Sequence, residues 1–125
     1  MSSLQRFASP LSAPLSKAVK AGDLLFLSGQ TPKNPDLTPL RGDIKTQTAN
    51  VIETIQATLA EFDLDLTSVI RCTVWLSDIK LMKDFNETYA SYFGAALPVR
   101  STVEARLSQD VDVEIEVTCW APAAR

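Results

Sequence analysis

One stretch near the carboxyl end alternates apolar side chains with polar or bulky ones at every step: Asp112-Val113-Glu114-Ile115-Glu116-Val117-Thr118-Cys119-Trp120. Successive side chains of a β-strand point to opposite faces of the sheet. One face of the predicted strand therefore carries Val113, Ile115, Val117 and Cys119, and the other carries Glu114, Glu116, Thr118 and Trp120. The pattern predicts a strand with one face against a core and a second face that mixes charge with aromatic bulk.

Four further strands are predicted upstream of it. Val69 to Leu76 alternates in the same way, with Ile70, Cys72, Val74 and Leu76 on its apolar face. Leu24 to Leu27 is apolar at every position, which predicts burial on both faces. The turn Ala21-Gly22-Asp23 joins that run to Ala18-Val19-Lys20 and predicts a hairpin. Val99 to Glu104, which follows a proline, reads as another strand.

Two helices are expected between these strands. Asp43 is a plausible N-cap for a helix from about Ile44 to Glu61, whose apolar residues recur every three or four positions. A second helix is expected over roughly 81–93, and Gly94 stands where a C-terminal glycine belongs. Residues 9–16 are predicted to be extended coil, and residues 31–42, which hold three prolines, a surface loop.

This order of elements indicates an α+β fold in which a mixed β-sheet has two helices packed on one face. Two helices cover only one face of a sheet. The uncovered face would carry Arg71, Trp75, Glu114, Glu116 and Trp120, which suggests that a partner covers it. With 125 residues, the chain is expected to form a single domain, 1-125, and to assemble as a homo-oligomer with clefts between subunits.

The composition excludes several kinds of chemistry. The sequence has no histidine and two cysteines far apart, which argues against Ser-His-Asp or Cys-His nucleophiles and against a zinc or other metal site. A net charge of −3 makes broad binding to nucleic acid unfavourable. No apolar run is long enough to cross a bilayer, so no membrane partner is expected. The thiols, Cys72 and Cys119, are read as core residues of a cytoplasmic protein.

Three sequence features are candidates for a site, and each has a structural alternative. The glycine of Ser28-Gly29-Gln30 allows a ligand to approach the backbone, although the same residues also fit a turn that ends a strand. Arg100 can offer its planar guanidinium to a carboxylate, or form an ordinary surface ion pair. Glu114 can move protons in a partly desolvated cleft, or belong with Glu116 to a polar sheet face.

Taken in order, these features resemble the YjgF/RidA (Rid) family of enamine/imine deaminases, older members of which carry the name of perchloric-acid-soluble endoribonucleases. The resemblance runs from about Ser9 to Pro122. It is carried by Ser16-Lys17-Ala18-Val19, Leu27-Ser28-Gly29-Gln30, Val74-Trp75-Leu76-Ser77-Asp78, Phe85-Asn86-Glu87-Thr88-Tyr89, Leu97-Pro98-Val99-Arg100-Ser101-Thr102-Val103 and Val113-Glu114-Ile115-Glu116.

The resemblance implies a chorismate-mutase-like (YjgF-type) fold, assembled as a homotrimer around a central barrel, with sites between subunits. By position, it implies that Arg100 grips the substrate carboxylate and that Glu114 positions or activates the attacking water. Ser28 and Gly29 would line the site, and Asn86 would support it. The family usually has a tyrosine where this chain has Leu15, so one polar contact is absent.

The function implied is hydrolytic deamination of 2-aminoacrylate and related 2-imino acids to 2-oxo acids and ammonia, as in a 2-iminobutanoate/2-iminopropanoate deaminase. No cofactor is expected, since such imines already hydrolyse in water and need orientation with modest acid–base help. The partners would be an imino acid or a 2-oxo acid. Two alternatives remain: a trimer that binds small carboxylates as a regulator without turning them over, and an endoribonuclease or translation inhibitor.

Overall fold

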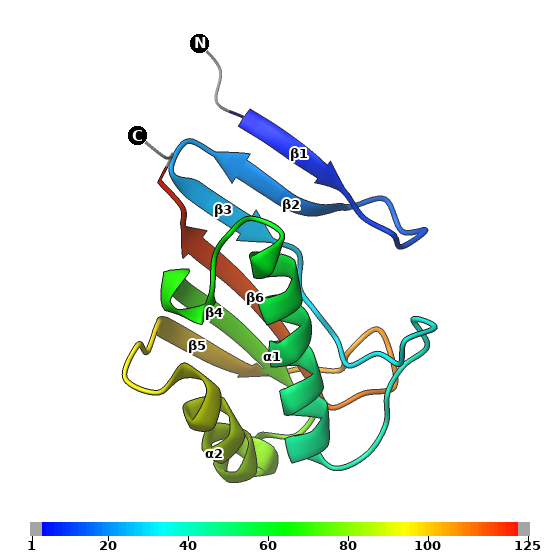
Figure 1. The fold of residues 1–125 in the computed structure, drawn as a ribbon. Coiled ribbons are helices and arrows are strands. Elements are labelled where there is room, and N and C mark those ends of the chain that lie inside the picture. Colours follow the sequence, from blue (N-terminus) through cyan, green and yellow to red (C-terminus); the bar gives the residue numbers. More distant parts are fainter. Residues whose placement is uncertain (1–3, 123–125) are drawn as a thin grey trace.

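A computed structural model describes residues 4–122 of the chain as one six-stranded mixed sheet with two helices on one of its faces (Figure 1). The strands are β1 Leu4–Ala8, β2 Ser16–Ala21, β3 Leu24–Leu27, β4 Val69–Leu76, β5 Val99–Glu104 and β6 Val113–Trp120. They lie in the order β1-β2-β3-β6-β4-β5, and β4 and β5 are parallel whereas every other neighbouring pair is antiparallel. The α+β prediction is confirmed.

The helices are α1, Ile44–Ala60, and α2, Met82–Phe93, and short 3-10 turns precede β4 and α2 at Leu66–Ser68 and Ile79–Leu81. Asp43 caps α1 as expected, because its carboxylate accepts a hydrogen bond from Thr46 N at 2.8 Å. Gly94 ends α2 with a positive φ of 57°, a conformation that side chains with a Cβ rarely adopt. Both predicted helices are therefore confirmed to within one residue at each end.

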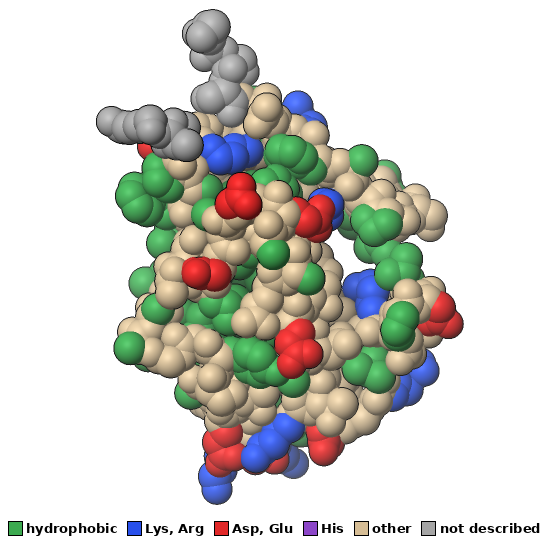
Figure 2. Space-filling view, viewed as in Figure 1, with side chains coloured by type: hydrophobic (Ala, Val, Ile, Leu, Met, Phe, Trp, Pro, Cys, Tyr) green, Lys and Arg blue, Asp and Glu red, His purple; other side chains and the backbone are tan. Residues whose placement is uncertain are grey.

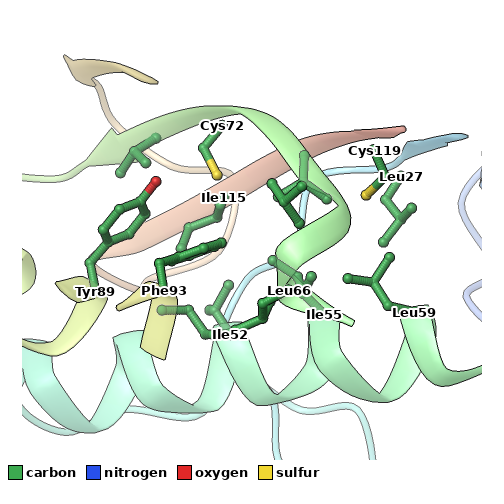
Figure 3. Close-up of a cluster of buried hydrophobic side chains, with 14 of the residues drawn as sticks. Leu27, Ile52, Ile55, Leu59, Leu66, Cys72, Tyr89, Phe93, Ile115 and Cys119 are labelled. Carbon is green, nitrogen blue, oxygen red and sulfur yellow. The ribbon is translucent and has the colours of Figure 1, made fainter. Parts of the chain in front are cut away.

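The core lies between the helices and the sheet (Figure 3). The side chains of Ile52, Ile55 and Leu59 on α1 meet Cys72 and Ile115 from the sheet, and each of the five is at most 1% exposed. Full burial of an aliphatic side chain is worth about 1.5–3 kcal/mol. This apolar layer fixes the orientation of every strand, and hence which face each polar residue of the sheet occupies.

The opposite face of the sheet has no helix over it (Figure 1). On β6, Val113, Ile115, Val117 and Cys119 are buried toward the helices, as predicted, so their neighbours in sequence face the other way. That uncovered face exposes Phe26 by 42%, Val103 by 45% and Trp120 by 56%. Large apolar side chains left in water at this density are typical of a surface that another protein covers.

Three details of the sequence prediction are wrong. Leu24–Leu27 is buried on one face only, because Phe26 lies on the uncovered face. Val69 is buried and Ile70 is 43% exposed, the reverse of the prediction, because an irregularity in the pairing with β6 shifts the strand by one residue there. The strand β1 was not predicted, since almost all of its side chains are exposed and it exists through its pairing with β2.

A buried polar network fixes the start of β6, two residues before Glu114. The Gln47 side chain, 1% exposed on α1, accepts a hydrogen bond from Asp112 N at 2.8 Å and donates to Asp112 Oδ2 at 3.0 Å. Ser77 Oγ donates to the other carboxylate oxygen of Asp112 at 2.6 Å. Buried polar groups that find all their partners hold a single geometry. Among residues 4–122, no helix is both long and apolar enough to span a membrane.

Candidate functional site

Glu114 lies on the uncovered face of the sheet, packed against Gly29 just beyond the end of β3. The backbone hydrogen bonds from Gln30 N to Ile115 O, 2.8 Å, and from Ile115 N to Gln30 O, 3.0 Å, hold the two segments together. The Glu114 carboxylate occupies the space that a side chain at position 29 would fill, and a Cβ there would overlap its Oε2. Glycine is therefore required at position 29 for Glu114 to adopt this position.

The pKa of Glu114 is shifted by its surroundings. Partial burial raises the pKa of this carboxyl above its ordinary value, because the charged form loses hydration. The positive charge of Lys33 acts in the opposite direction, and the negative charge of Glu116 adds a smaller upward shift. A carboxylate with a raised pKa is a stronger proton acceptor when ionised, as a general base requires.

Ser28 precedes this glycine and is tied to β2. Its hydroxyl donates to Ser16 O at 2.6 Å, and its backbone N–H donates to Lys17 O at 3.2 Å. The hydroxyl proton is therefore engaged by the protein, and its oxygen lone pairs are what it can offer a ligand. Ser28 is suited to accept a hydrogen bond from substrate or water, rather than to attack as a nucleophile.

Ser28 and Gly29 open onto a cavity of about 710 Å³, beside α1 and between residues 8–15 and the loop 31–42. Figure 2 shows the hollow at the right of the view, between the body of the molecule and these two flanking segments. Leu15, at which the family usually has tyrosine, lies on its wall and is 44% exposed. At this position the wall of the cavity is therefore an apolar leucine side chain instead of a tyrosine hydroxyl.

Lys33 also lines this cavity, and nothing in the sequence motifs pointed to it. Its ammonium group donates to Thr31 Oγ1 at 2.8 Å and to Thr31 O at 3.3 Å. Burial lowers the pKa of Lys33, and the charge of Glu114 opposes that shift. A lone lysine in a loop carries no signal in a sequence, since its position beside Glu114 exists only in the folded chain. Ser28, Gly29, Lys33 and Glu114 are called the Glu114 cluster below.

Arg100 lies on the other face of the sheet, under α2. Its Cζ is 4.8 Å from the centroid of the Tyr89 ring and 5.4 Å from that of Phe85, and Nη2 lies 3.8 Å from Met82 Sδ. Cation–π contacts of this kind hold a guanidinium in place and leave its positive charge available to an anion. No carboxylate oxygen of residues 4–122 lies within 4.0 Å of a guanidinium nitrogen of Arg100, so Arg100 forms no ion pair with any of these residues.

Asn86 belongs to the same helix, one turn after Met82. Its side-chain oxygen Oδ1 is buried and has no hydrogen-bond partner among the described residues. A buried acceptor without a donor is costly, and such groups concentrate at functional sites. The residues Met82, Phe85, Asn86, Tyr89 and Arg100 are called the Arg100 cluster below.

The two cysteines contribute to the core, as predicted. Cys72 and Cys119 are fully buried and unbridged, and burial raises the pKa of both thiols, that of Cys119 to about 12. Figure 3 shows both sulfur atoms within the apolar cluster, with the Tyr89 hydroxyl directed toward the strand of Cys72. Across residues 4–122, no three His, Cys, Asp or Glu side chains are grouped so that they could hold a metal ion.

The two clusters lie on opposite faces of one sheet. Arg100 is paired across the strands with Cys72, whose side chain is buried beneath the helices, whereas Glu114 is paired with Trp75 on the uncovered face. The structure therefore brings Ser28, Gly29 and Glu114 together, and places Arg100 and Asn86 apart from them. A single copy of the chain does not direct Arg100 and Glu114 at one substrate.

Comparisons with known proteins give the chain relatives over most of its length. The family model described as Endoribonuclease L-PSP matches residues 7–121. A RutC family protein of Pyrococcus horikoshii is 44% identical over 109 residues, which cover 86% of this chain and 86% of that protein. A protein of Saccharomyces cerevisiae, Mmf1, described as mitochondrial, is 36% identical over 90% of this chain and 78% of its own length.

Solved structures agree with these matches. The crystal structure of yeast Mmf1 superposes with a TM-score of 0.89 at 32% identity, covering 95% of this chain and 99% of that one. A protein of the Rid family from Yersinia pestis superposes with a TM-score of 0.84 at 33% identity, covering 93% of this chain and 94% of its own. Because one relative is described as mitochondrial, the cytoplasmic location of this chain stays a prediction.

Proposed function

The chain belongs to the endoribonuclease L-PSP family, the YjgF/RidA family, and we propose that it hydrolyses 2-aminoacrylate and related 2-imino acids to 2-oxo acids and ammonia. The observation that carries this proposal is the state of Arg100. A half-buried guanidinium lies fixed against two aromatic rings, and no carboxylate of residues 4–122 is paired with it. The carboxylate of a 2-imino acid is a matching ligand, because a guanidinium binds it with two parallel hydrogen bonds.

Glu114 supplies the acid–base chemistry of the proposed reaction. As a water molecule attacks the imine carbon, the ionised Glu114 accepts one of its protons, and the π electrons of the C=N bond move to nitrogen. Glu114 returns this proton to the nitrogen, which gives a carbinolamine with one C–OH and one C–NH2 group. Glu114 then takes the hydroxyl proton and delivers it to the nitrogen as the C–N bond breaks, so that ammonia leaves and the C=O bond of the 2-oxo acid forms. A positioned acid–base group of this kind contributes about a hundredfold or more.

Both charges reach one substrate if two copies of the chain meet. We place each site between subunits, with Arg100 from one subunit and Glu114 from its neighbour, in the homotrimer that the resemblance implies. The uncovered sheet face, with Phe26, Val103 and Trp120 exposed, supports this assembly because a second copy would remove that apolar surface from water. Glu114 lies on that same face, which supports its place at the proposed interface.

The family description also names an endoribonuclease, and the chain's charge and composition favour the deaminase. A net charge of −3 disfavours binding to a phosphate backbone, and the absence of histidine removes the usual acid–base residues of a metal-independent ribonuclease. Imine hydrolysis requires neither binding to a phosphate backbone nor a histidine, since the substrate carbon is already electrophilic.

A coupled assay tests the proposal. An amino-acid oxidase generates the imine of alanine or 2-aminobutanoate, and semicarbazide traps whatever imine remains unhydrolysed. The wild-type protein is expected to lower semicarbazone formation relative to buffer, and Arg100→Ala to reduce the rate enhancement about a hundredfold by removing the carboxylate's charged partner. The matched control is Arg41→Ala, which removes an exposed arginine. Equal semicarbazone yields with and without the wild-type protein would refute the deaminase, whereas binding of a 2-oxo acid without turnover would indicate the regulatory trimer.

A further inference from the structure

Lys33 is held by the protein more firmly than an ordinary loop lysine. Its backbone N–H donates to Asn50 Oδ1 at 2.9 Å, and Asn50 Nδ2 donates back to Lys33 O at 3.0 Å. This pair of bonds ties the loop 31–42 to α1 at one residue. The lysine side chain is anchored in turn by its two bonds to Thr31, whose own side chain is 7% exposed. Lys33 therefore has a defined position before any ligand arrives.

The ammonium group of Lys33 retains capacity for a ligand. A lysine ammonium has three N–H donors, and the two acceptors of Thr31 use two of them. No carboxylate oxygen in the described part of the chain lies within 4.0 Å of Lys33 Nζ. By contrast Lys17, the other lysine that lines the cavity, forms an ion pair with Glu61 at 2.6 Å. Of these two cations, only Lys33 has no carboxylate oxygen within 4.0 Å, although the charge of Glu114 acts on it from farther away.

The cavity that Lys33 lines is continuous with the expected substrate residues Ser28 and Gly29. At about 710 Å³ it exceeds what a three-carbon or four-carbon imino acid fills. A substrate held at its 2-carboxylate end by Arg100 would extend its side chain away from that end. Lys33 lines this cavity together with Leu11 and Leu15, so a substrate side chain that entered it would meet one positive charge and an apolar wall for its methylene groups.

We propose that Lys33 is a specificity-determining residue that binds a second acidic group, so that the site favours 2-imino acids whose side chain ends in a carboxylate. The inference rests on the proposed deaminase function and names its substrate class. Lys33 attracts the distal carboxylate with its free N–H donor, whereas an imine with an uncharged side chain of the same length gains nothing from it. Charged hydrogen bonds in a partly dehydrated cavity discriminate strongly between such ligands.

The test compares two imines of similar length, those of glutamate and methionine, each generated by an oxidase in the coupled assay. The quantity measured is the ratio of the two rate enhancements, acidic over uncharged. The wild-type ratio is expected to exceed one, and Lys33→Met to lower it about tenfold or more. Lys33→Arg is expected to retain most of the preference because it keeps the charge. The matched control, Lys17→Met, is expected to keep the wild-type ratio within about twofold, since Lys17 is already paired.

Two results would overturn the assignment: a wild-type preference for the methionine imine, or equal loss of both reactions in Lys33→Met. If the wild-type protein hydrolyses no imine, calorimetry with 2-oxoglutarate and the 2-oxo acid of methionine separates the two claims. Tighter binding of 2-oxoglutarate that weakens about tenfold in Lys33→Met supports the role of Lys33 although the deaminase has failed. Equal affinities, or no binding of either, overturn it.

Discussion

The two polar clusters of this chain are built in opposite ways. In the Glu114 cluster a carboxylate is half-buried against a glycine, with Lys33 and Glu116 acting on its pKa. In the Arg100 cluster a guanidinium lies against two aromatic rings, and no carboxylate among residues 4–122 pairs with it. The first cluster faces the uncovered side of the sheet, and the second faces the helices.

The Arg100 cluster lacks a carboxylate, the Glu114 cluster lacks a guanidinium, and the sheet separates the two clusters within one chain. The Glu114 cluster can move a proton, while the Arg100 cluster can orient an anion. In the proposed reaction, neither cluster alone supplies both functions. We propose that the two clusters are halves of one site that is completed where subunits meet, and the following variants weaken the half that holds Glu114.

The largest effect in the Glu114 cluster is expected from Glu114→Gln. The amide keeps the shape of the side chain but does not accept a proton from water, so kcat should fall about a hundredfold while KM changes little. The measurement is steady-state hydrolysis in the semicarbazide assay. Glu116→Gln, on the same strand and the same face, is the matched control and should leave kcat near the wild-type value. A fall of the same size in both variants would indicate damage to the interface instead of lost catalysis.

A smaller effect is expected from Gly29→Ala. The added methyl group competes with Glu114 Oε2 for the same space, so the carboxylate must move while its charge stays. We expect kcat to fall about tenfold, because a displacement near 1 Å costs a positioned group part of its contribution. The control is Gly22→Ala in the hairpin turn, where an added Cβ meets no atom within 4 Å but the positive φ of 59° disfavours alanine, so that stability falls while kcat stays near the wild-type value. Unchanged kinetics in Gly29→Ala would show that the placement of Glu114 does not matter.

The smallest effect is a shift in the pH profile. Glu114 acts in its ionised form, so kcat/KM should fall as pH decreases through its pKa, which burial holds above the ordinary value. Removing the negative charge in Glu116→Gln should move this acid limb to lower pH, and removing the positive charge in Lys33→Met should move it to higher pH. If the acid limbs of the kcat/KM profiles move in the same direction in both variants, the assignment of Glu114 as the base is contradicted.

The sequence predicts most of the fold because its patterns are local. The alternation in β6, the N-cap at Asp43 and the glycine after α2 each depend on residues that are neighbours along the chain. The strand β1 could not be predicted, since it is defined by its partner and not by its own side chains. Ile70 was misplaced for a similar reason: an irregularity in strand pairing has no signature in a simple alternation.

The candidate site shows the same limit. Ser28, Gly29, Arg100 and Glu114 stand out by their chemistry and place on the predicted strands and also lie in motifs of the family, whereas Asn86 follows from the resemblance alone. Lys33 does not stand out in the sequence, because its importance comes from contacts with Thr31 and Asn50 that bring a loop against α1. Nor did the sequence tell whether Arg100 and Glu114 act from one chain or two. That depends on which face each strand presents, and strand pairing fixes it only in the folded sheet.

Mixing two inactive variants tests the central claim most directly. Arg100→Ala and Glu114→Gln are co-expressed in equal amounts, so that subunits assemble at random, and the imine hydrolysis of the purified mixture is compared with each variant alone. If each site takes Arg100 from one subunit and Glu114 from the next, about a quarter of all sites in the mixture hold both intact residues, and activity should return to about a quarter of the wild-type value. If assemblies shown to contain both variants remain as inactive as each variant alone, the account is contradicted.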